Sequence, residues 1–419
     1  MEKAQNETEI KWQPINPNPG NNKDPKNFVG RVEISSRACE MLDAGQDILI
    51  SDPRRTGKTF WMKTFKETEQ KYRFIYIDYQ GSASSKDFLS ETVKGISECL
   101  SLPEKFKKNI TNLFDFVEVE AGIGVFKLKT AVKKAGKSEM DIMENLLTKL
   151  DEELENQKDE RPLVIEMDEV PDALIEIAEK EGKEGKEDAL ILMQKLQKLR
   201  RSSRNIRWII AGSIGFHHVL NRIGTTTAVL SGLNTLKFGP LKPEEAKELV
   251  SRLALGINRK ITDDVAAEIV KETDGFAIFI TKLFDMMRPG SDVNTGKGSI
   301  ISKSEYQGRL EEYILDFDDS RDATHYVQRI DDYYGDKTKL AKTILKYMAV
   351  VDEWIFITEL ENAIKSSSKK GFDREAFIDT LHSLVSDHYL DEWKEGGKKV
   401  VAWRYKIIKR IYIEREELL

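Results

Sequence analysis

The sequence predicts an α/β protein with a helix-covered parallel sheet in residues 28–240, followed by two smaller parts. Three observations support this fold class. Apolar runs typical of buried strands alternate with helical segments over residues 28–240. Residues 241–316 show a purely helical pattern. Residues 317–419 contain helical segments followed by two short strands around a Gly-Gly turn.

Composition narrows the class of protein. A chain of 419 residues is long enough for two or three domains with substantial cores. A charged fraction of 33% and a net charge of −6 indicate a charged surface, and they argue against a protein that coats nucleic acid over its whole surface. Cys39 and Cys99 are the two cysteines, with no Cys/His cluster, which indicates neither a disulfide framework nor a zinc site.

The N-terminal residues 1–27 are polar and rich in Pro and Asn, and they lack the apolar core of a signal peptide. We expect them to form a mobile or loosely docked tail. The sequence has no apolar run near the roughly 18–20 residues that cross a bilayer. We therefore expect a cytoplasmic protein without membrane contact.

Within residues 28–240 each element follows from a local pattern. Apolar runs bounded by turn residues predict the strands, and helical periodicity predicts the helices. The predicted strands are 47–50, 72–80, 161–170, 206–215 and a segment before a turn at Pro240. The predicted helices are 28–45, 59–70, two stretches over 86–115, 138–157, 189–204 and one after Pro240; a hairpin is expected at 116–132 and a charged loop at 179–188.

The segment "SDPRRTGKTF" (51–60) follows the first strand, and its "GKT" ends the phosphate-binding pattern G-x-x-x-x-G-K-[ST]. In such a loop, backbone N–H groups and the N-terminus of the next helix bind phosphates. Lys58 would reach the β- and γ-phosphates and Thr59 would ligate Mg²⁺. Gly57 lets the backbone come close to the phosphates. The remaining loop residues predicted to contact nucleotide are Pro53, Arg54, Arg55, Thr56 and Phe60.

Asp52 occupies the position of the first glycine of this pattern. Aspartate tolerates unusual backbone angles and often begins turns before Pro. Its charge beside a triphosphate is unfavourable unless the side chain is capped or faces Arg54 or Arg55. We expect the loop to bind nucleotide, with a scaffold that binds without turnover as the alternative.

Two further strand ends carry polar side chains. Asp168 ends the apolar run of the strand at 161–170, where it would hold the magnesium shell, and Glu169 would orient the attacking water. The alternative for these acids is an N-cap of the next helix. Ser213, just past the apolar run of the strand segment 206–215, would sense the γ-phosphate, or it would only cap the following helix.

Together these motifs resemble the archaeal-type ATPase clade near the STAND NTPases, within the AAA+ class. The matching segments are "FVGR" (Phe28–Arg31), "PRRTGKT" (Pro53–Thr59), "DE" (Asp168–Glu169) and "GS" (Gly212–Ser213). The similarity covers about residues 28–288. It implies a P-loop NTPase core, a helical lid over 241–316 and a winged helix over 317–419, with ATP and Mg²⁺ as cofactors. Asp52 and Val32 depart from the family pattern.

The resemblance also implies a base site and a lid contact. In the family the "FVGR" segment lies over the adenine, so Val29, Gly30 and Arg31 become base-site candidates, and the lid motif is represented by Gly275 and Phe276 without its usual Pro. The family often places an arginine before the sensor strand that reaches a neighbour's γ-phosphate. The candidates are Arg200, Arg201 and Arg204, and the alternative is a solvated basic helix end.

The C-terminal part bears on the choice between a regulatory function and DNA binding. Helical stretches at 325–350, 357–367 and 373–387 precede the hairpin. Most of the charged residues in the third stretch are acidic. A helix that reads the major groove normally presents Arg, Lys, Asn or Gln. We therefore expect a nucleotide-dependent regulatory switch that acts through a protein partner or self-association. The alternative is a DNA-handling ATPase that binds duplex DNA through residues 365–370 and 398–410.

Overall fold

The computed structural model describes residues 12–20, 24–99, 117–119, 126–128, 138–156, 160–180, 183–213, 215–289, 298–315, 321–368 and 371–416. The chain divides into two compact units. One consists of Val32–Arg54 and Lys58–Gly239, and we call it the sheet unit. The other consists of the described parts of Met1–Arg31, Arg55–Gly57 and Pro240–Leu419, and we call it the helical unit.

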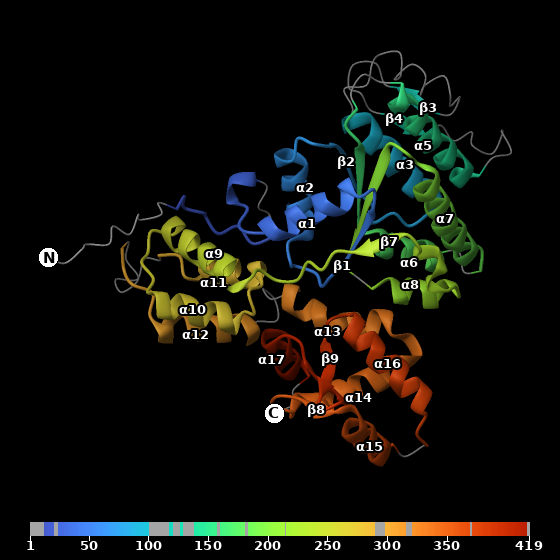
Figure 1. Cartoon of the computed structure of the whole chain (residues 1–419). Helices are drawn as coiled ribbons and strands as arrows, with labels where there is room; N and C mark the ends of the chain where they lie inside the picture. The colour runs from blue at the N-terminus through green and yellow to red at the C-terminus, as the bar shows by residue number, and fades with distance from the viewer. Residues whose placement is uncertain are drawn as a thin grey trace. The chain divides into compact units, whose positions relative to one another are not determined.

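The sheet unit is built on five parallel strands in the order β2-β5-β6-β1-β7 (Figure 1). Their bounds are β1 Asp47–Ser51, β2 Arg73–Asp78, β5 Leu163–Asp168, β6 Ile206–Gly212 and β7 Leu233–Thr235. Every residue of β5 is buried, as expected for a strand covered on both faces. Between β1 and β2 the chain passes over two strand positions, so the carboxyl ends of β1, β5 and β6 lie next to one another. Open parallel sheets bind ligands at such a point.

Helices cover both faces of this sheet (Figure 1). Helices α1 and α2 lie on one face, and α3, α6 and α7 lie on the other, because right-handed crossovers in opposite directions place their helices on opposite faces. The helices of the unit are α1 Val32–Asp43, α2 Lys58–Thr68, α3 Ser85–Cys99, α5 Glu139–Glu155, α6 Val170–Lys180, α7 Lys183–Ser202 and α8 Phe216–Ile223, with the short η3 Thr227–Leu230.

The predicted charged loop at 179–188 is wrong. Helix α6 extends to Lys180 and α7 already begins at Lys183, while residues 181–182 lie outside the described chain. Glu and Lys are good helix formers, and these charges lie on exposed turns of a helix. Gly185 permits close packing of the two helices, since a Cβ atom there would lie 2.3 Å from the carbonyl oxygen of Ile177.

The hairpin expected at 116–132 is confirmed in its strands. β3 (Val117–Val119) and β4 (Phe126–Leu128) pair antiparallel, with Glu118 opposite Lys127. The connection between them lies outside the described residues, as does the second helical stretch predicted between 100 and 115.

The helical unit begins with residues 12–20, which run as an ordered segment against α9 (Pro243–Gly256). Ile15 is buried, and its backbone N–H donates to the Arg252 carbonyl at 2.9 Å. The Arg252 side chain in turn donates to the carbonyls of Gln13 and Lys26. The expected mobile or loosely docked tail is therefore corrected for these residues, because Ile15 supplies an apolar anchor; residues 1–11 lie outside the described chain.

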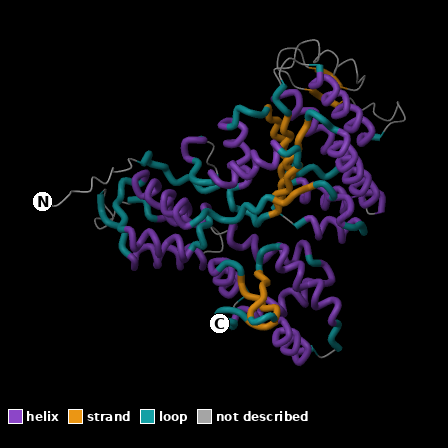
Figure 2. Tube along the Cα trace, in the orientation of Figure 1, coloured by secondary structure: helices purple, strands orange, loops and turns teal. Residues whose placement is uncertain are grey.

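The rest of the helical unit consists of helices and one small sheet, shown in purple and orange in Figure 2. The short η1 Pro25–Asn27 precedes α9. After α9 come α10 Asp263–Glu272, α11 Ala277–Met286, α12 Lys303–Leu315, α13 Arg321–Tyr333, the short η5 Gly335–Lys337, α14 Thr338–Ala349, α15 Ile357–Ser367, α16 Arg374–Ser386 and α17 Lys406–Arg415. The antiparallel sheet has the order β8-β10-β9, with β8 Ile355–Phe356, β9 Leu390–Glu395 and β10 Lys398–Trp403.

Two local predictions in this unit need correction. The single helix expected at 325–350 is two helices, α13 and α14, with η5 between them, because Gly335 takes a φ of 52°. The basic segment after the hairpin forms a further helix, α17. Most of the loop expected at 287–299 lies outside the described residues.

One hydrophobic core runs through the whole helical unit. It contains Ile15, Phe276 of the segment before α11, Tyr326 of α13 and Tyr412 of α17. The helices on both sides of residue 316 therefore share buried surface. In the part of the chain that the structure describes, no helix is both long and apolar enough to span a bilayer.

Candidate active site

The loop between β1 and α2 has the backbone that its sequence predicts. Gly57 has a φ of 94°, which residues with a side chain rarely adopt, and Arg55 has a φ of 68°. A Cβ atom at Gly57 would meet no atom within 4 Å, so the backbone angle and not the space requires glycine. The loop passes directly into α2 at Lys58. The N-terminal N–H groups of a helix favour anions.

Asp52 is held by the backbone of a distant segment. Its carboxylate accepts hydrogen bonds from the N–H groups of Phe238 and Gly239, each at 3.0 Å, and the residue is 5% exposed. Asp52 is not one of the described residues with a positive φ, so its conformation does not require glycine. The sequence analysis requires the charge of Asp52 to be capped if the loop is to bind a triphosphate, and these two hydrogen bonds cap it.

Lys58 folds back over its own loop. Its Nζ donates to the carbonyl oxygens of Asp52 and Pro53, at 2.6 and 2.8 Å, and the residue is buried. The ammonium group therefore lies within the loop, where backbone carbonyls satisfy it in place of water.

Thr59 and Asp168, the predicted metal-binding pair, are in direct contact. Thr59 Oγ1 donates to Asp168 Oδ2 at 2.6 Å, and the hydroxyl of Tyr76 donates to the same oxygen at 3.0 Å. Burial, together with the charge of neighbouring Glu169, raises the pKa of Asp168 to about 6. A hydroxyl and a carboxylate side by side are the oxygen donors that Mg²⁺ prefers. These residues therefore fit the cation that the resemblance implies.

Glu169 lies next to Ser213, as the strand order requires. Its Oε2 accepts the backbone N–H of Ser213 at 3.1 Å, and its own φ of 55° is uncommon for a residue with a side chain. Burial alone would raise the pKa of Glu169. The hydrogen bond that it shares with the Asp172 carboxyl group, with the charges of Lys58 and Arg54, instead holds the pKa below its usual value. An ionised carboxylate is the form needed to accept a proton.

Arg54 completes this arrangement. Its Nε donates to Ser213 Oγ at 3.0 Å, and its Nη2 lies 3.5 Å from Asp172 Oδ1. Ser213 Oγ also donates to Asp172 Oδ2 at 3.4 Å. The ends of β1, β5 and β6 thus contribute Arg54, Asp172 with Glu169, and Ser213 to one hydrogen-bonded cluster.

Sequence reasoning missed Tyr76 and Asp172. Tyr76 belongs to β2, and its proximity to Asp168 depends on the pairing of β2 with β5, which the local pattern does not reveal. Asp172 had a usable signal. It follows Glu169 by three residues, at a position that a helix places next to it.

The "FVGR" segment lies in the helical unit. Val29 is buried in its core. At Gly30 the φ is 69° and a Cβ atom would lie 2.5 Å from the Glu245 side chain. The Arg31 guanidinium donates to the carbonyls of Thr56 at 2.7 Å and Pro240 at 3.1 Å. Arg31 therefore fixes the backbone of the loop at Thr56, and contact of these residues with a base stays a prediction.

The lid motif is also in the helical unit. Phe276 is fully buried and packs against Phe279, Tyr326 and Tyr405, at centroid distances of 5.4, 6.4 and 4.9 Å. Its ring could contact a base only by leaving this core. Gly275, with a φ of 71°, borders a cavity of about 440 Å³ and accepts the Leu241 N–H through its carbonyl.

The remaining loop positions and the three candidate arginines differ in exposure. In the loop, Pro53 and Thr56 are buried, Phe60 is half-buried and Arg55 is exposed.

Arg200 is buried, lies 3.5 Å from Asp47 and donates to the Ser231 carbonyl, so it has a structural role. Arg201 and Arg204 are exposed and remain the candidates for a residue acting on a neighbouring copy.

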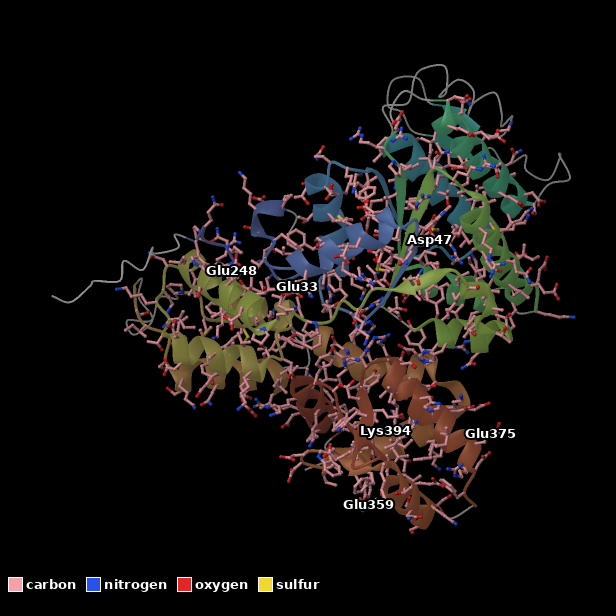
Figure 3. The ribbon with its side chains drawn as sticks, viewed as in Figure 1. Glu33, Asp47, Glu248, Glu359, Glu375 and Lys394 are labelled. Atoms are coloured by element: carbon pink, nitrogen blue, oxygen red, sulfur yellow. The ribbon has the colours of Figure 1, made fainter. Side chains whose placement is uncertain are left out.

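In the segment 398–410 proposed for DNA contact, several basic side chains have partners. Lys399 lies 2.5 Å from Glu392, Arg410 pairs with Glu311, and Lys409 donates to the Val351 carbonyl. In the other segment, residues 369–370 lie outside the described chain. Figure 3 shows the acidic Glu375 on α16 and Glu359 on α15, and Lys394 on β9 of the hairpin.

Comparisons with known proteins agree with this architecture. No protein-family model matches the sequence, and no curated protein matches it. A Walker-type ATPase of Pyrococcus abyssi is similar in structure, with 15% identity, a TM-score of 0.60, and coverage of 92% of this chain and 96% of that one. The ORC2 protein of Aeropyrum pernix, solved in ADPNP–ADP complexes, has 13% identity, a TM-score of 0.50, and coverage of 96% of this chain and 95% of that one.

At these identities the likeness concerns the fold. The five-stranded parallel sheet, the helical regions and the small C-terminal antiparallel sheet form an α/β fold that these two solved structures share. The fold class that the sequence predicts is therefore confirmed.

Proposed function

We propose that this protein binds ATP with Mg²⁺ and hydrolyses it, and that its nucleotide state switches an interaction with a protein partner or a second copy. One observation carries the enzymatic part. Thr59, in the first turn of α2, contacts Asp168, the last residue of β5, with Thr59 Oγ1 2.6 Å from Asp168 Oδ2, and Glu169 follows Asp168 directly in the chain. Phosphoryl transfer to water requires a hydroxyl and a carboxylate that hold the metal ion, and a second carboxylate that orients the water.

In this proposal each residue has one task. The loop backbone and the N-terminus of α2 bind the phosphates, and Lys58 leaves the carbonyls of Asp52 and Pro53 to meet the β- and γ-phosphates. Thr59 holds Mg²⁺ directly, and Asp168 holds its water shell. Bound Mg²⁺ neutralises charge that develops on the phosphate oxygens.

Hydrolysis then follows at the γ-phosphate. Water oriented by Glu169 attacks the γ-phosphorus while the bond to the β–γ bridging oxygen breaks, and ADP leaves with the electron pair of that bond. The proton of the water passes to Glu169 or to the released phosphate. Ser213 donates its N–H to Glu169 and accepts from Arg54, so a change at the γ-phosphate that moves either residue would also move Ser213.

The switch part rests on the helical unit. Arg31 links the loop carbonyl of Thr56 to the carbonyl of Pro240, and Asp274, next to the lid motif, accepts the Ile407 N–H at 2.8 Å at the start of α17. A change in the loop would therefore act on a unit whose lid and C-terminal helices are packed together. The paired basic residues and acidic α16 favour a protein partner over duplex DNA.

The test measures ATP binding and phosphate release by the purified full chain and by two variants. Lys58→Ala is expected to weaken ATP binding about 10- to 100-fold, because a charged hydrogen-bond donor to phosphate is lost. Glu169→Gln is expected to bind ATP but to hydrolyse it about 10²- to 10⁴-fold more slowly.

The controls are Lys66→Ala, at a half-buried position on α2, and Glu176→Gln, at an exposed position on α6, and both variants should match the wild type. Equal turnover in Glu169→Gln and Glu176→Gln would contradict the role of Glu169. Addition of duplex DNA at several salt concentrations tests the alternative function, since binding with a steep salt dependence would favour a DNA-handling ATPase.

A further inference from the structure

Asp172 occupies an unusual place for an acidic residue. It lies in the first turn of α6, is 8% exposed, and shares a hydrogen bond with Glu169. Two carboxyl groups in contact repel each other when both are ionised, and burial strengthens this penalty. The ion pair with Arg54 and the first-turn position on α6 favour an acid here, whereas the contact with Glu169 disfavours one.

The surroundings of Asp172 show what its carboxyl group holds. Oδ1 lies 3.5 Å from Arg54 Nη2, and Oδ2 accepts from Ser213 Oγ at 3.4 Å. Ser213 is also the residue whose backbone N–H binds Glu169, at 3.1 Å. Asp172 thus contacts Glu169 directly and also contacts both groups that surround it.

The backbone at Glu169 needs this support. A φ of 55° at a residue with a side chain is strained and persists only where neighbouring contacts enforce it. The side chain of Glu169 has three rotatable bonds, so without lateral contacts its carboxylate would sample several positions. The contacts with Asp172 and the Ser213 N–H select one of them.

We propose that Asp172 is a positioning residue for Glu169, holding its carboxylate against the Ser213 N–H and holding Arg54 beside Ser213. This inference rests on the proposed ATP hydrolysis and adds a residue to it. Asp172 itself exchanges no proton with substrate. It acts by keeping the water-orienting carboxylate and the loop arginine in one arrangement before the reaction, which is how preorganised sites accelerate chemistry.

The experiment compares two replacements of nearly the same size in the full-length protein. Asp172→Asn keeps a donor for Glu169 and one acceptor oxygen for Arg54 or Ser213, whereas Asp172→Leu keeps only the volume. We expect kcat for ATP hydrolysis to fall about 10- to 100-fold in Asp172→Leu and by less than about fivefold in Asp172→Asn. The dissociation constant for ATP, measured by titration, should change by less than about threefold in both.

A double-mutant cycle shows whether the effect passes through Glu169. If it does, Asp172→Leu added to Glu169→Gln lowers the residual rate by less than about twofold, because the carboxylate to be positioned is already absent. Equal kcat values for Asp172→Asn and Asp172→Leu would overturn the inference, as would a full additional loss in the double variant.

These outcomes separate the two proposals. An active wild type with indistinguishable Asp172 variants overturns only the positioning role. A wild type that binds ATP without releasing phosphate overturns the proposed hydrolysis and, with it, the role of Asp172. Far-ultraviolet circular dichroism and the melting temperature of each variant identify a loss caused by unfolding. In that case Asp172→Asn, which keeps a donor and one acceptor at this position, alone decides, and a loss of more than about tenfold in its kcat contradicts the inference.

Discussion

At the scale of single residues, Asp52 changes how the loop motif should be understood. The consensus glycine is absent, but the loop does not need it, because Asp52 has a negative φ and its carboxylate binds two backbone N–H groups. We predict that Asp52→Gly, which restores the consensus, lowers the free energy of unfolding by about 1–3 kcal/mol, since buried N–H groups lose their acceptor. Urea denaturation of the full chain measures the change.

Asp52→Asn provides the matched comparison, because its single carbonyl oxygen can accept from only one of the two N–H groups. Its free energy of unfolding should lie between those of the wild type and Asp52→Gly. An Asp52→Gly variant as stable as the wild type would show that water or a neighbour satisfies these groups equally well.

Which residue roles could be predicted depended on whether the partners carry a sequence signature. Thr59 and Asp168, which the sequence assigns to one Mg²⁺ site, are in direct contact, because both lie at the carboxyl ends of strands that share one edge of the sheet; their binding of the ion stays a prediction. The partners of Asp52 are 186 and 187 residues away and are backbone groups without a sequence signature. The burial of Phe276 likewise depends on Tyr326 and Tyr405, which belong to distant helices.

At the scale of elements, the residue next to the lid motif is hydrogen-bonded to α17. The carboxylate of Asp274 accepts the N–H of Ile407 in the first turn of α17, and no side chain of the N-cap residue Tyr405 serves this purpose. Burial raises the pKa of Asp274 to about 6, against the opposing effects of the Ile407 hydrogen bond and nearby Lys406. The ionised carboxylate therefore costs free energy in the folded state.

The sign of the pH effect follows from this shift. The folded state binds the proton of Asp274 more tightly than the unfolded state, whose aspartate has a pKa near 3.8. The contribution is thus fully present below pH 3.8 and is lost as the pH rises through about 6. We predict that Asp274→Asn, which keeps an acceptor but cannot ionise, gains stability relative to the wild type between pH 4 and 7, by about 2–3 kcal/mol. Denaturation at several pH values measures this difference, and a difference independent of pH would contradict the assignment.

At the scale of the whole molecule, the sequence predicted a lid over 241–316 and a winged helix over 317–419 as separate parts, and these boundaries stay a proposal. Local patterns define where helices begin and end, but they do not show which helices bury one another. In the structure a single core includes α11 of the first part and α13 and α17 of the second. This points to one cooperative unit.

Cooperativity of this kind has a consequence that can be measured. Phe276→Ala removes a fully buried ring, which costs about 3–5 kcal/mol, and it lies in contact with Tyr405 beside α17. We predict that this variant loses hydrogen-exchange protection in α11 and α17 together, by similar factors, because both open in the same event. Phe377→Ala, in the core of α16, should in turn reduce protection in α11. Loss confined to α10 and α11 in the first variant, and to α14–α16 in the second, would instead mean two domains that open separately. A nucleotide-driven movement of the lid would then not have to carry the C-terminal helices with it, and the proposed switch would need another route to its partner.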